Sequence, residues 1–307
     1  MLLKNNKRLV IFSIFSFALV FLLARPGFSF WGQSETVISP HLLLGNPSGA
    51  TKSLKNPDNY LMVKPQFVLS YNQQKSIPNW VSWQLNKSWL GKYKRCKSQS
   101  NKDRFMLDSD LPVAISGVLP TDYRGSGFDR GHMIPSGDRT ASGEDNCATF
   151  VMTNIIPQTR DINRGPWETL ENYSRKLAKN GQELYIIAGG VGVGGESAKG
   201  EVIKSLAGFD SGLKINVPAL CWKIILVLEQ PSLGLKGITP ESRVIAVAMK
   251  QQMGTRDLYW DDHDQDGSLR YITSVKEIER LTGYNFLSNL PKSLQDVLEN
   301  KIDSGSQ

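Results

Sequence analysis

Three short apolar runs in the second half of the chain constrain its fold more than any other feature. They cover residues 183–189, 222–228 and 243–249. Their continuous apolar character is typical of buried strands. Strands occur in runs with a few helices between them, and a regular strand–helix alternation is absent from the sequence. This pattern predicts an α+β fold with a largely antiparallel central sheet flanked by helices.

Further strands are expected in the first half of the chain. Residues 60–71 have a β-like pattern that Pro65 interrupts, and apolar and polar residues alternate over 79–86. Residues 148–154 also have strand character. The polar, charged segment 94–110 is expected to be a loop. The sequence contains no linker that would divide 60–290 into two domains.

One helix is well marked. It is expected to begin at Pro166, a favoured first-turn residue, and to end near Gly181. Its buried side is predicted from residues that recur every three or four positions: Trp167, Leu170, Tyr173 and Leu177. Shorter helices are expected over 275–281 and 290–302.

The N-terminus has the pattern of an export signal. Three basic residues (Lys4, Lys7 and Arg8) precede an uncharged apolar run over 9–24, which ends before Arg25. The run is short for a membrane span, which needs about 20 apolar residues, so a cleaved signal is favoured over a retained anchor. We therefore expect a signal peptide over 1–30, an extended segment over 31–59 and a single domain over 60–307. The mature protein is expected to be periplasmic or secreted, without lasting membrane association.

The charge of the chain is compatible with a polyanionic partner but does not require one. The formal net charge is +7, and Lys4, Lys7, Arg8 and Arg25 contribute four positive charges to a segment without Asp or Glu. Removal of residues 1–30 leaves 7 − 4 = +3. A mildly basic protein of this kind can bind nucleic acid, although charge alone would not identify one.

Three cysteines, Cys96, Cys147 and Cys221, leave two interpretations open. They form no C-x-x-C pair, which disfavours a zinc site. An exported protein could form one disulfide and keep one thiol. Three separate buried thiols are the alternative.

His132 is the strongest candidate for chemistry. It lies in the sequence Phe-Asp-Arg-Gly-His-Met, directly after a glycine-rich turn over 121–131, and it is one of three histidines in the chain. Histidine is the usual general base near neutral pH. A lone histidine is nevertheless more often structural, so this residue needs support from its surroundings.

The helix after Pro166 supplies that support. Glu171 and Arg175 are four residues apart and share one helix face, and Asn163 lies eight residues before Glu171. Eight residues of helix rise about 12 Å and turn about 80° beyond two full turns. If the helix or its first turn begins near Asn163, all three side chains can face one cleft. The alternative is an ordinary solvated Glu–Arg pair.

The residue types in this region suit phosphate chemistry with a metal. The amide oxygen of Asn163 is a suitable ligand for Mg²⁺, which prefers oxygen and keeps several waters. Arg95, Arg130 and Arg175 could make charge-assisted contacts to phosphate.

Three elements in a fixed order resemble the DNA/RNA non-specific endonuclease family, or DRGH nucleases, of the ββα-metal (His-Me finger) superfamily. The first is Asp129-Arg130-Gly131-His132, and the second is the sequence Thr-Asn-Ile-Ile-Pro-Gln over 153–158. The third is Asn163 with Glu171 and Arg175 at the spacing given above. The resemblance extends from about residue 42 to 288 and is strongest for the secreted bacterial sugar-nonspecific members.

The resemblance implies a role for each residue. His132 would be the general base, and Asn163 the one direct protein ligand of Mg²⁺, with Mn²⁺ as an alternative metal. Glu171 would hold waters of the metal shell, and Asp129 would hold the loop. The remaining residues would stabilise the transition state (Arg95), support the phosphate and the metal waters (Arg130 and Arg175) or help by hydrogen bonding (Asn154). Arg104 competes with Arg95 for its role, because the loop over 96–110 is longer than in the relatives.

The implied activity is sequence- and sugar-nonspecific hydrolysis of DNA and RNA, single or double stranded, that leaves 5′-phosphates. A protein inhibitor is an expected further partner. Two other functions remain open at this point. One is a catalytically inactive nucleic-acid-binding protein, and the other is an exported phosphodiesterase that acts on small substrates.

Overall fold

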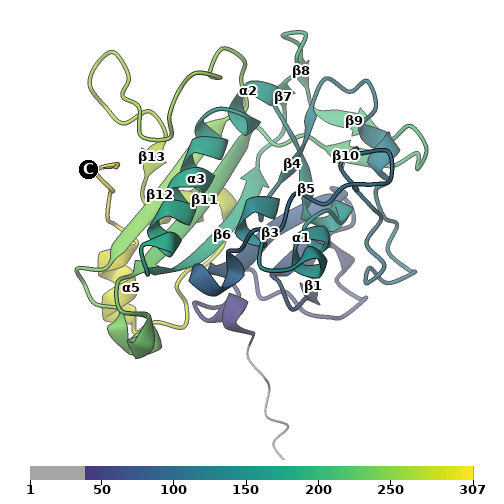
Figure 1. The fold of residues 1–307 in the computed structure, drawn as a ribbon. Helices are drawn as coiled ribbons and strands as arrows, with labels where there is room; N and C mark the ends of the chain where they lie inside the picture. The colour runs from purple at the N-terminus through teal and green to yellow at the C-terminus, as the bar shows by residue number, and fades with distance from the viewer. Residues whose placement is uncertain (1–38, 307) are drawn as a thin grey trace, which may run out of the picture. The chain divides into compact units, whose positions relative to one another are not determined.

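A seven-stranded antiparallel sheet organises residues 39–306, the part of the chain that the computed structural model describes (Figure 1). The strands follow the order β1-β2-β3-β6-β11-β12-β13, and each neighbouring pair is antiparallel. Their bounds are β1 (Tyr60–Val63), β2 (Val68–Asn72), β3 (Ile77–Leu85), β6 (Glu183–Val191), β11 (Leu220–Leu228), β12 (Arg243–Lys250) and β13 (Ile272–Thr273). The predicted α+β fold with a largely antiparallel sheet is confirmed. The expected signal peptide over 1–30 and residues 31–38 lie outside the described residues.

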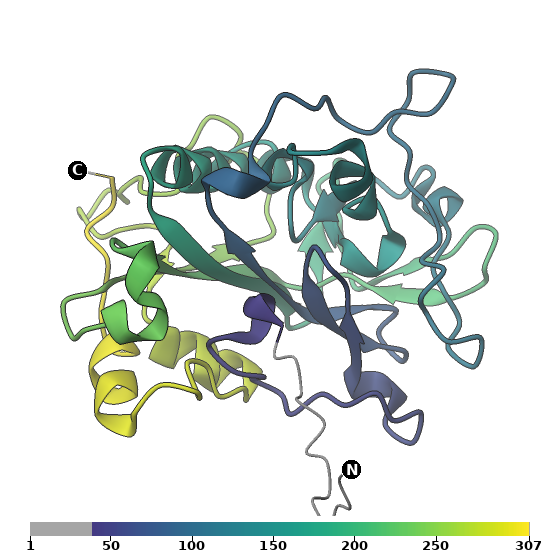
Figure 2. The ribbon, with the colours of Figure 1, turned by 60° about the horizontal axis from the view of Figure 1, so that its bottom comes forward.

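The sheet is covered on both faces, which explains why its central strands are apolar throughout. Along β11, Cys221, Ile225 and Val227 pack into one cluster, whereas Trp222 and Ile224 pack into the other. Helix α3 (Pro166–Lys179) covers the first face, and α4 (Val275–Thr282) and α5 (Lys292–Leu298) contribute to the second cluster. Figure 2 shows the sheet between these two helical layers. No helix within residues 39–306 has the length and apolarity that crossing a bilayer requires.

Helix α3 begins and ends where its sequence predicts. Pro166 occupies its first turn, and Asn180 follows its last residue. Gly181 has a φ of 101°, a left-handed conformation that glycine adopts at little cost after a helix. The other two predicted helices are also present, as α4 and α5.

The strand predicted over 148–154 is wrong. Helix α1 (Gly143–Ala148) ends there, a 3₁₀ turn occupies Met152–Asn154, and strand β5 (Ile155–Gln158) begins only afterwards. The side chain of Asn154 bonds the backbone of this segment, since its Nδ2 donates to the carbonyl oxygen of Thr149 at 2.8 Å. A polar side chain that competes in this way for backbone groups favours a turn over a strand.

The remaining elements are short. Three two-stranded sheets pair β4 (Asp129–His132) with β5, β7 (Gly195–Glu196) with β8 (Val202–Ile203), and β9 (Ser205–Ala207) with β10 (Lys214–Asn216). A helical turn, α2 (Arg160–Asn163), precedes α3. The 3₁₀ helices are η1 (Pro40–Leu42), η2 (Pro57–Asn59), η3 (Lys87–Trp89), η4 (Pro120–Tyr123), η5 (Ser136–Asp138), η6 (Met152–Asn154) and η7 (Pro231–Gly237). Residues 39–59 pack against the sheet, where Trp80 Nε1 donates to Ser48 Oγ at 2.8 Å.

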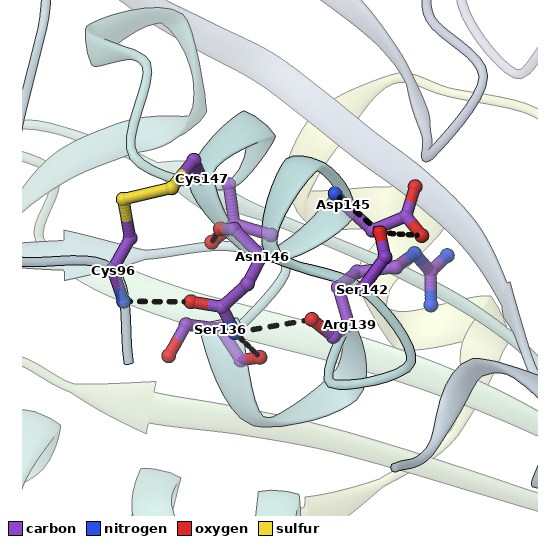
Figure 3. The surroundings of a disulfide bond; sticks show 8 residues. Cys96, Ser136, Arg139, Ser142, Asp145, Asn146 and Cys147 are labelled. Carbon is purple, nitrogen blue, oxygen red and sulfur yellow. Dashed lines mark hydrogen bonds between the residues drawn. A yellow bond between two sulfur atoms is a disulfide. The ribbon is translucent and has the colours of Figure 1, made fainter. Parts of the chain in front are cut away.

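One disulfide joins Cys96 to Cys147 and connects the loop over 94–110 to α1 (Figure 3). Beside it, Asn146 accepts a bond from the Cys96 backbone N–H at 2.8 Å and donates to the Ser136 carbonyl oxygen at 2.7 Å. Cys221 is a free, fully buried thiol. Of the two interpretations of the cysteines, the structure therefore supports one disulfide and one thiol.

Thiol labelling tests this arrangement. Burial raises the pKa of Cys221 to about 12, so a thiolate is scarcely formed at neutral pH and the thiol is inaccessible to reagent. We expect iodoacetamide to modify no cysteine in the native chain, one in guanidinium chloride without reductant, and all three after reduction, as read by intact mass. A labelled cysteine in the native chain would contradict the assignment.

Candidate active site

A ββα unit brings the two most important candidate residues together. Strands β4 and β5 pair antiparallel, so that His132 lies opposite Ile155 and Asp129 lies opposite Gln158. The chain then turns through α2, whose last residue is Asn163. Asn163 therefore lies in its own helical turn and not in α3. Gly165 permits the break between the two helices, because a Cβ at this position would lie 2.5 Å from the Asp161 carbonyl oxygen.

The carboxylate of Asp129 fixes Asn163. Asn163 Nδ2 donates to Asp129 Oδ2 at 2.9 Å, and Arg164 adds two bonds to the same carboxylate at 2.7 and 2.8 Å. Because the amide nitrogen is engaged, the amide oxygen of Asn163 remains available as an acceptor. No donor from residues 39–306 bonds to that oxygen at hydrogen-bond distance.

Six of the seven predicted site residues line one cleft of about 350 Å³: Arg95, Arg130, His132, Asn163, Glu171 and Arg175. Ser136 and Glu168, which were not predicted, also line it. A second volume of about 370 Å³ shares Arg95, Arg130 and Asn163 with the first, so the two adjoin. The structure therefore brings together most of the set that the sequence predicts.

Asn154, the seventh residue, lies outside the cleft and is completely buried. Its Oδ1 accepts from the backbone N–H of Ile134 at 3.1 Å, and its Nδ2 donates to the carbonyl oxygen of the same residue at 3.0 Å. Its own backbone oxygen accepts from the Met133 N–H at 3.0 Å. These bonds fix the two residues after His132, so Asn154 can position the site without contact to substrate.

His132 is held between aromatic rings as a neutral imidazole. Its ring centroid lies 4.9 Å from that of Phe150 and 5.4 Å from that of Phe105. Burial, and secondarily the positive charge of Arg95, lower the pKa of His132 to about 3. Its Nε2 is buried and has no hydrogen-bond partner within residues 39–306. A neutral imidazole is the form that can accept a proton.

Glu171 lies at the floor of the cleft with a buried positive charge behind it. Burial raises the pKa of Glu171 to about 7, although Lys223 and Arg175 oppose the shift. Lys223 Nζ lies 3.9 Å from Glu171 Oε1 and 4.0 Å from the centroid of the Trp167 ring. Sequence reasoning missed Lys223, although a lysine inside the apolar run 222–228 was a usable signal.

Each of the three predicted arginines of the cleft is oriented by a polar partner. Arg95 bonds Ser136 Oγ at 3.2 Å, Arg130 donates to the Pro120 carbonyl oxygen at 2.9 Å, and Arg175 bonds Asp138 at 2.9 Å. Arg104, the alternative to Arg95, is exposed and lines neither volume. The geometry therefore favours Arg95 over Arg104 as the residue that faces the cleft.

The donor set fits a mostly hydrated divalent cation. Residues 39–306 contain no cluster of three or more His, Cys, Asp or Glu that could hold a metal. The cleft instead offers the amide oxygen of Asn163 and the carboxylates of Glu168 and Glu171. A few oxygen ligands suit Mg²⁺, which retains much of its water, better than they suit Zn²⁺.

A ββα unit with a neutral histidine, an asparagine amide and several arginines in one cleft defines a metal-dependent nuclease of the ββα type. The chain belongs to the DNA/RNA non-specific endonuclease family, whose sequence profile matches residues 45–293. It is 48% identical over 268 residues to a nuclease of Nostoc sp., with 87% of each chain covered. It is 29% identical over 230 residues to the mouse mitochondrial nuclease EXOG, covering 73% of this chain and 56% of the mouse protein.

The fold has a solved counterpart. A chain in the crystal structure of the EndoG/EndoGI complex, described as showing the mechanism of EndoG inhibition, superposes with a TM-score of 0.60 and 22% identity. The match covers 83% of this chain and 92% of that one. The similarity shows that this chain and that one share a fold.

The lowered pKa of His132 predicts a pH dependence of stability. Between its ordinary value of 6.5 and about 3, the unfolded chain binds a proton that the folded chain does not, so acid favours unfolding. We expect the unfolding free energy of the wild type, relative to His132→Gln, to decrease from pH 7 to pH 5. The slope is limited to about 1.4 kcal/mol per pH unit. Urea denaturation measures this difference. His41 is buried in both proteins, so its contribution to the pH dependence is the same in each and cancels in the comparison. A pH-independent difference would show that His132 titrates normally.

Proposed function

We propose that the protein is a sequence- and sugar-nonspecific endonuclease that hydrolyses DNA and RNA, single or double stranded, with Mg²⁺ or Mn²⁺. The observation that carries this proposal is the convergence of His132 and Asn163 on one arginine-lined cleft. Membership in the nuclease family supports the reaction class.

In the proposed reaction, neutral His132 takes a proton from water as the water attacks phosphorus, and the 3′ oxygen leaves. The 5′-phosphate therefore remains on the product. Asn163 Oδ1 would hold the metal, and Glu171 would orient the waters around it. Such a cation supplies positive charge for the phosphate and the leaving oxygen. Arg95, Arg130 and Arg175 stabilise the charge that develops on the phosphate oxygens.

The charge of the cleft supports a lack of sequence preference. Its cationic residues are arginines suited to phosphate contacts, and phosphate carries no base information. Contacts of this kind would accept deoxyribose and ribose backbones alike.

Degradation of plasmid DNA and of RNA tests the mechanism. Purified protein is assayed with Mg²⁺, with EDTA, and as His132→Ala. We expect EDTA to abolish cleavage and the alanine change to reduce the rate by about 10²- to 10⁴-fold, since it removes the general base. Activity that survives both changes would refute the mechanism.

The two alternative functions give different results in the same assay. An inactive binding protein would show salt-sensitive binding without cleavage. A phosphodiesterase for small substrates would hydrolyse small esters and leave polymers intact. The presence of His132, Asn163, Glu171 and Arg175 in one cleft favours the nuclease over an inactive protein.

We also propose that the chain is exported, with a signal peptide over 1–30, and that a protein inhibitor binds it. The basic and apolar N-terminus supports export. The similarity to a chain of the EndoG/EndoGI complex supports the inhibitor. We expect intact mass of protein from a secreting host to show cleavage near residue 30, after the apolar run over 9–24. A mature chain that begins at Met1 would contradict export by a cleaved signal.

A further inference from the structure

The carboxylate of Asp103 bonds to two cationic side chains beside the candidate site. Arg95 approaches it with Nε at 2.9 Å and Nη2 at 2.8 Å, and Lys97 Nζ lies 2.7 Å from its other oxygen. All three residues line the second volume beside the candidate site. Although burial acts to raise it, bonds from Arg95 and Lys97 lower the pKa of Asp103, so the group remains a carboxylate at neutral pH.

This arrangement has the chemistry of an arginine–phosphate contact. Two oxygens of one anion accept bonds from a guanidinium and an ammonium, as phosphate oxygens do. Arg95 also reaches Ser136 in the first volume, so the same guanidinium faces both parts of the cleft. A polyanion that enters the cleft therefore meets two cations that already have an anionic partner.

A phosphate can replace Asp103 in its contacts with Arg95 and Lys97. The side chains of Arg95, Lys97 and Asp103 are 42%, 43% and 27% exposed, so water reaches every partner. Exposed ion pairs of this kind contribute about 0 to 1 kcal/mol each. A substrate phosphate carries the same single negative charge and belongs to a polyanionic backbone, so it can displace such a carboxylate at low cost.

We propose that the Asp103 carboxylate competes with a substrate phosphate for Arg95 and Lys97. When nucleic acid binds, Asp103 leaves these two cations and phosphate replaces it. This inference rests on the proposed function and adds Lys97 to the residues that bind the backbone. Asp103 then sets how tightly and how salt-dependently the free enzyme binds a polyanion, and Lys97 contacts a phosphate beside the scissile one.

The test is binding of a fluorescein-labelled thymidine 12-mer, measured by fluorescence anisotropy in EDTA with the full chain carrying His132→Ala. We expect Asp103→Asn to lower Kd by about three- to tenfold at 0.1 M salt, because two cations lose an internal competitor. The slope of log K against log salt should steepen by about 0.7 for each cation that gains a phosphate contact on the single strand. Adding Lys97→Gln to Asp103→Asn should reverse part of the gain in affinity, because one of the two cations is then absent.

Asp110→Asn is the matched control. It makes the same charge change in the same loop, but Asp110 pairs with Lys64 and lines neither volume. If Asp103→Asn and Asp110→Asn have equal Kd values, net charge explains the effect and the proposal is wrong. If Asp103→Asn weakens binding and, with His132 intact, lowers kcat, Asp103 only orients Arg95. The proposed function fails separately, by absence of Mg²⁺-dependent cleavage in the wild type.

Discussion

The antiparallel pairing of β4 with β5 is the constraint on which the cleft depends. It places His132 at one end of β4 and Asp129 three residues away at the other end, a separation of about 10 Å along a strand. The four residues of α2 then return the chain so that Asn163 meets the Asp129 carboxylate. The backbone positions that carry the imidazole and the amide oxygen are therefore set by one short strand and the turn after it, and Phe105 of the loop over 94–110 then packs against the imidazole.

Buried charged side chains lie beneath the cleft and connect its residues to the core. Asp138 and Lys223 are buried, and they accompany Arg175 and Glu171 at the floor of the cleft. A buried charge is costly unless it has partners, so each of these groups depends on its neighbours. The aromatic ring of Trp167 under the Lys223 ammonium provides part of that compensation. This floor places the cations of Lys223 and Arg175 beside the Glu171 carboxylate.

The sequence predicted those features that depend on local pattern or on motif spacing. Helix α3 is an example, since Pro166, Gly181 and its apolar periodicity are local signals. The backbone of 148–154 was mispredicted because an apolar run indicates burial but not conformation, and the Asn154 side chain decides the conformation. Phe105 and Phe150, which hold His132, gave no signal because loop aromatics carry no periodicity. The cysteine pairing depends on a contact 51 residues apart in sequence.

Arg95 differs from His132 in its backbone. His132 lies on strand β4, whereas Arg95 lies on an irregular loop and yet must face the phosphate. Its neighbour Cys96 is bonded to α1 through Cys147, and Asn146 fixes the Cys96 backbone to the segment that carries Ser136 (Figure 3). The Cys96 backbone is thus held by the disulfide and by its hydrogen bond to Asn146, which in turn donates to the Ser136 carbonyl oxygen. If a phosphate replaces Asp103, only side chains have to move, and the ordering cost of binding stays small. A long loop can therefore carry a residue of the cleft because the disulfide removes its freedom at that one point.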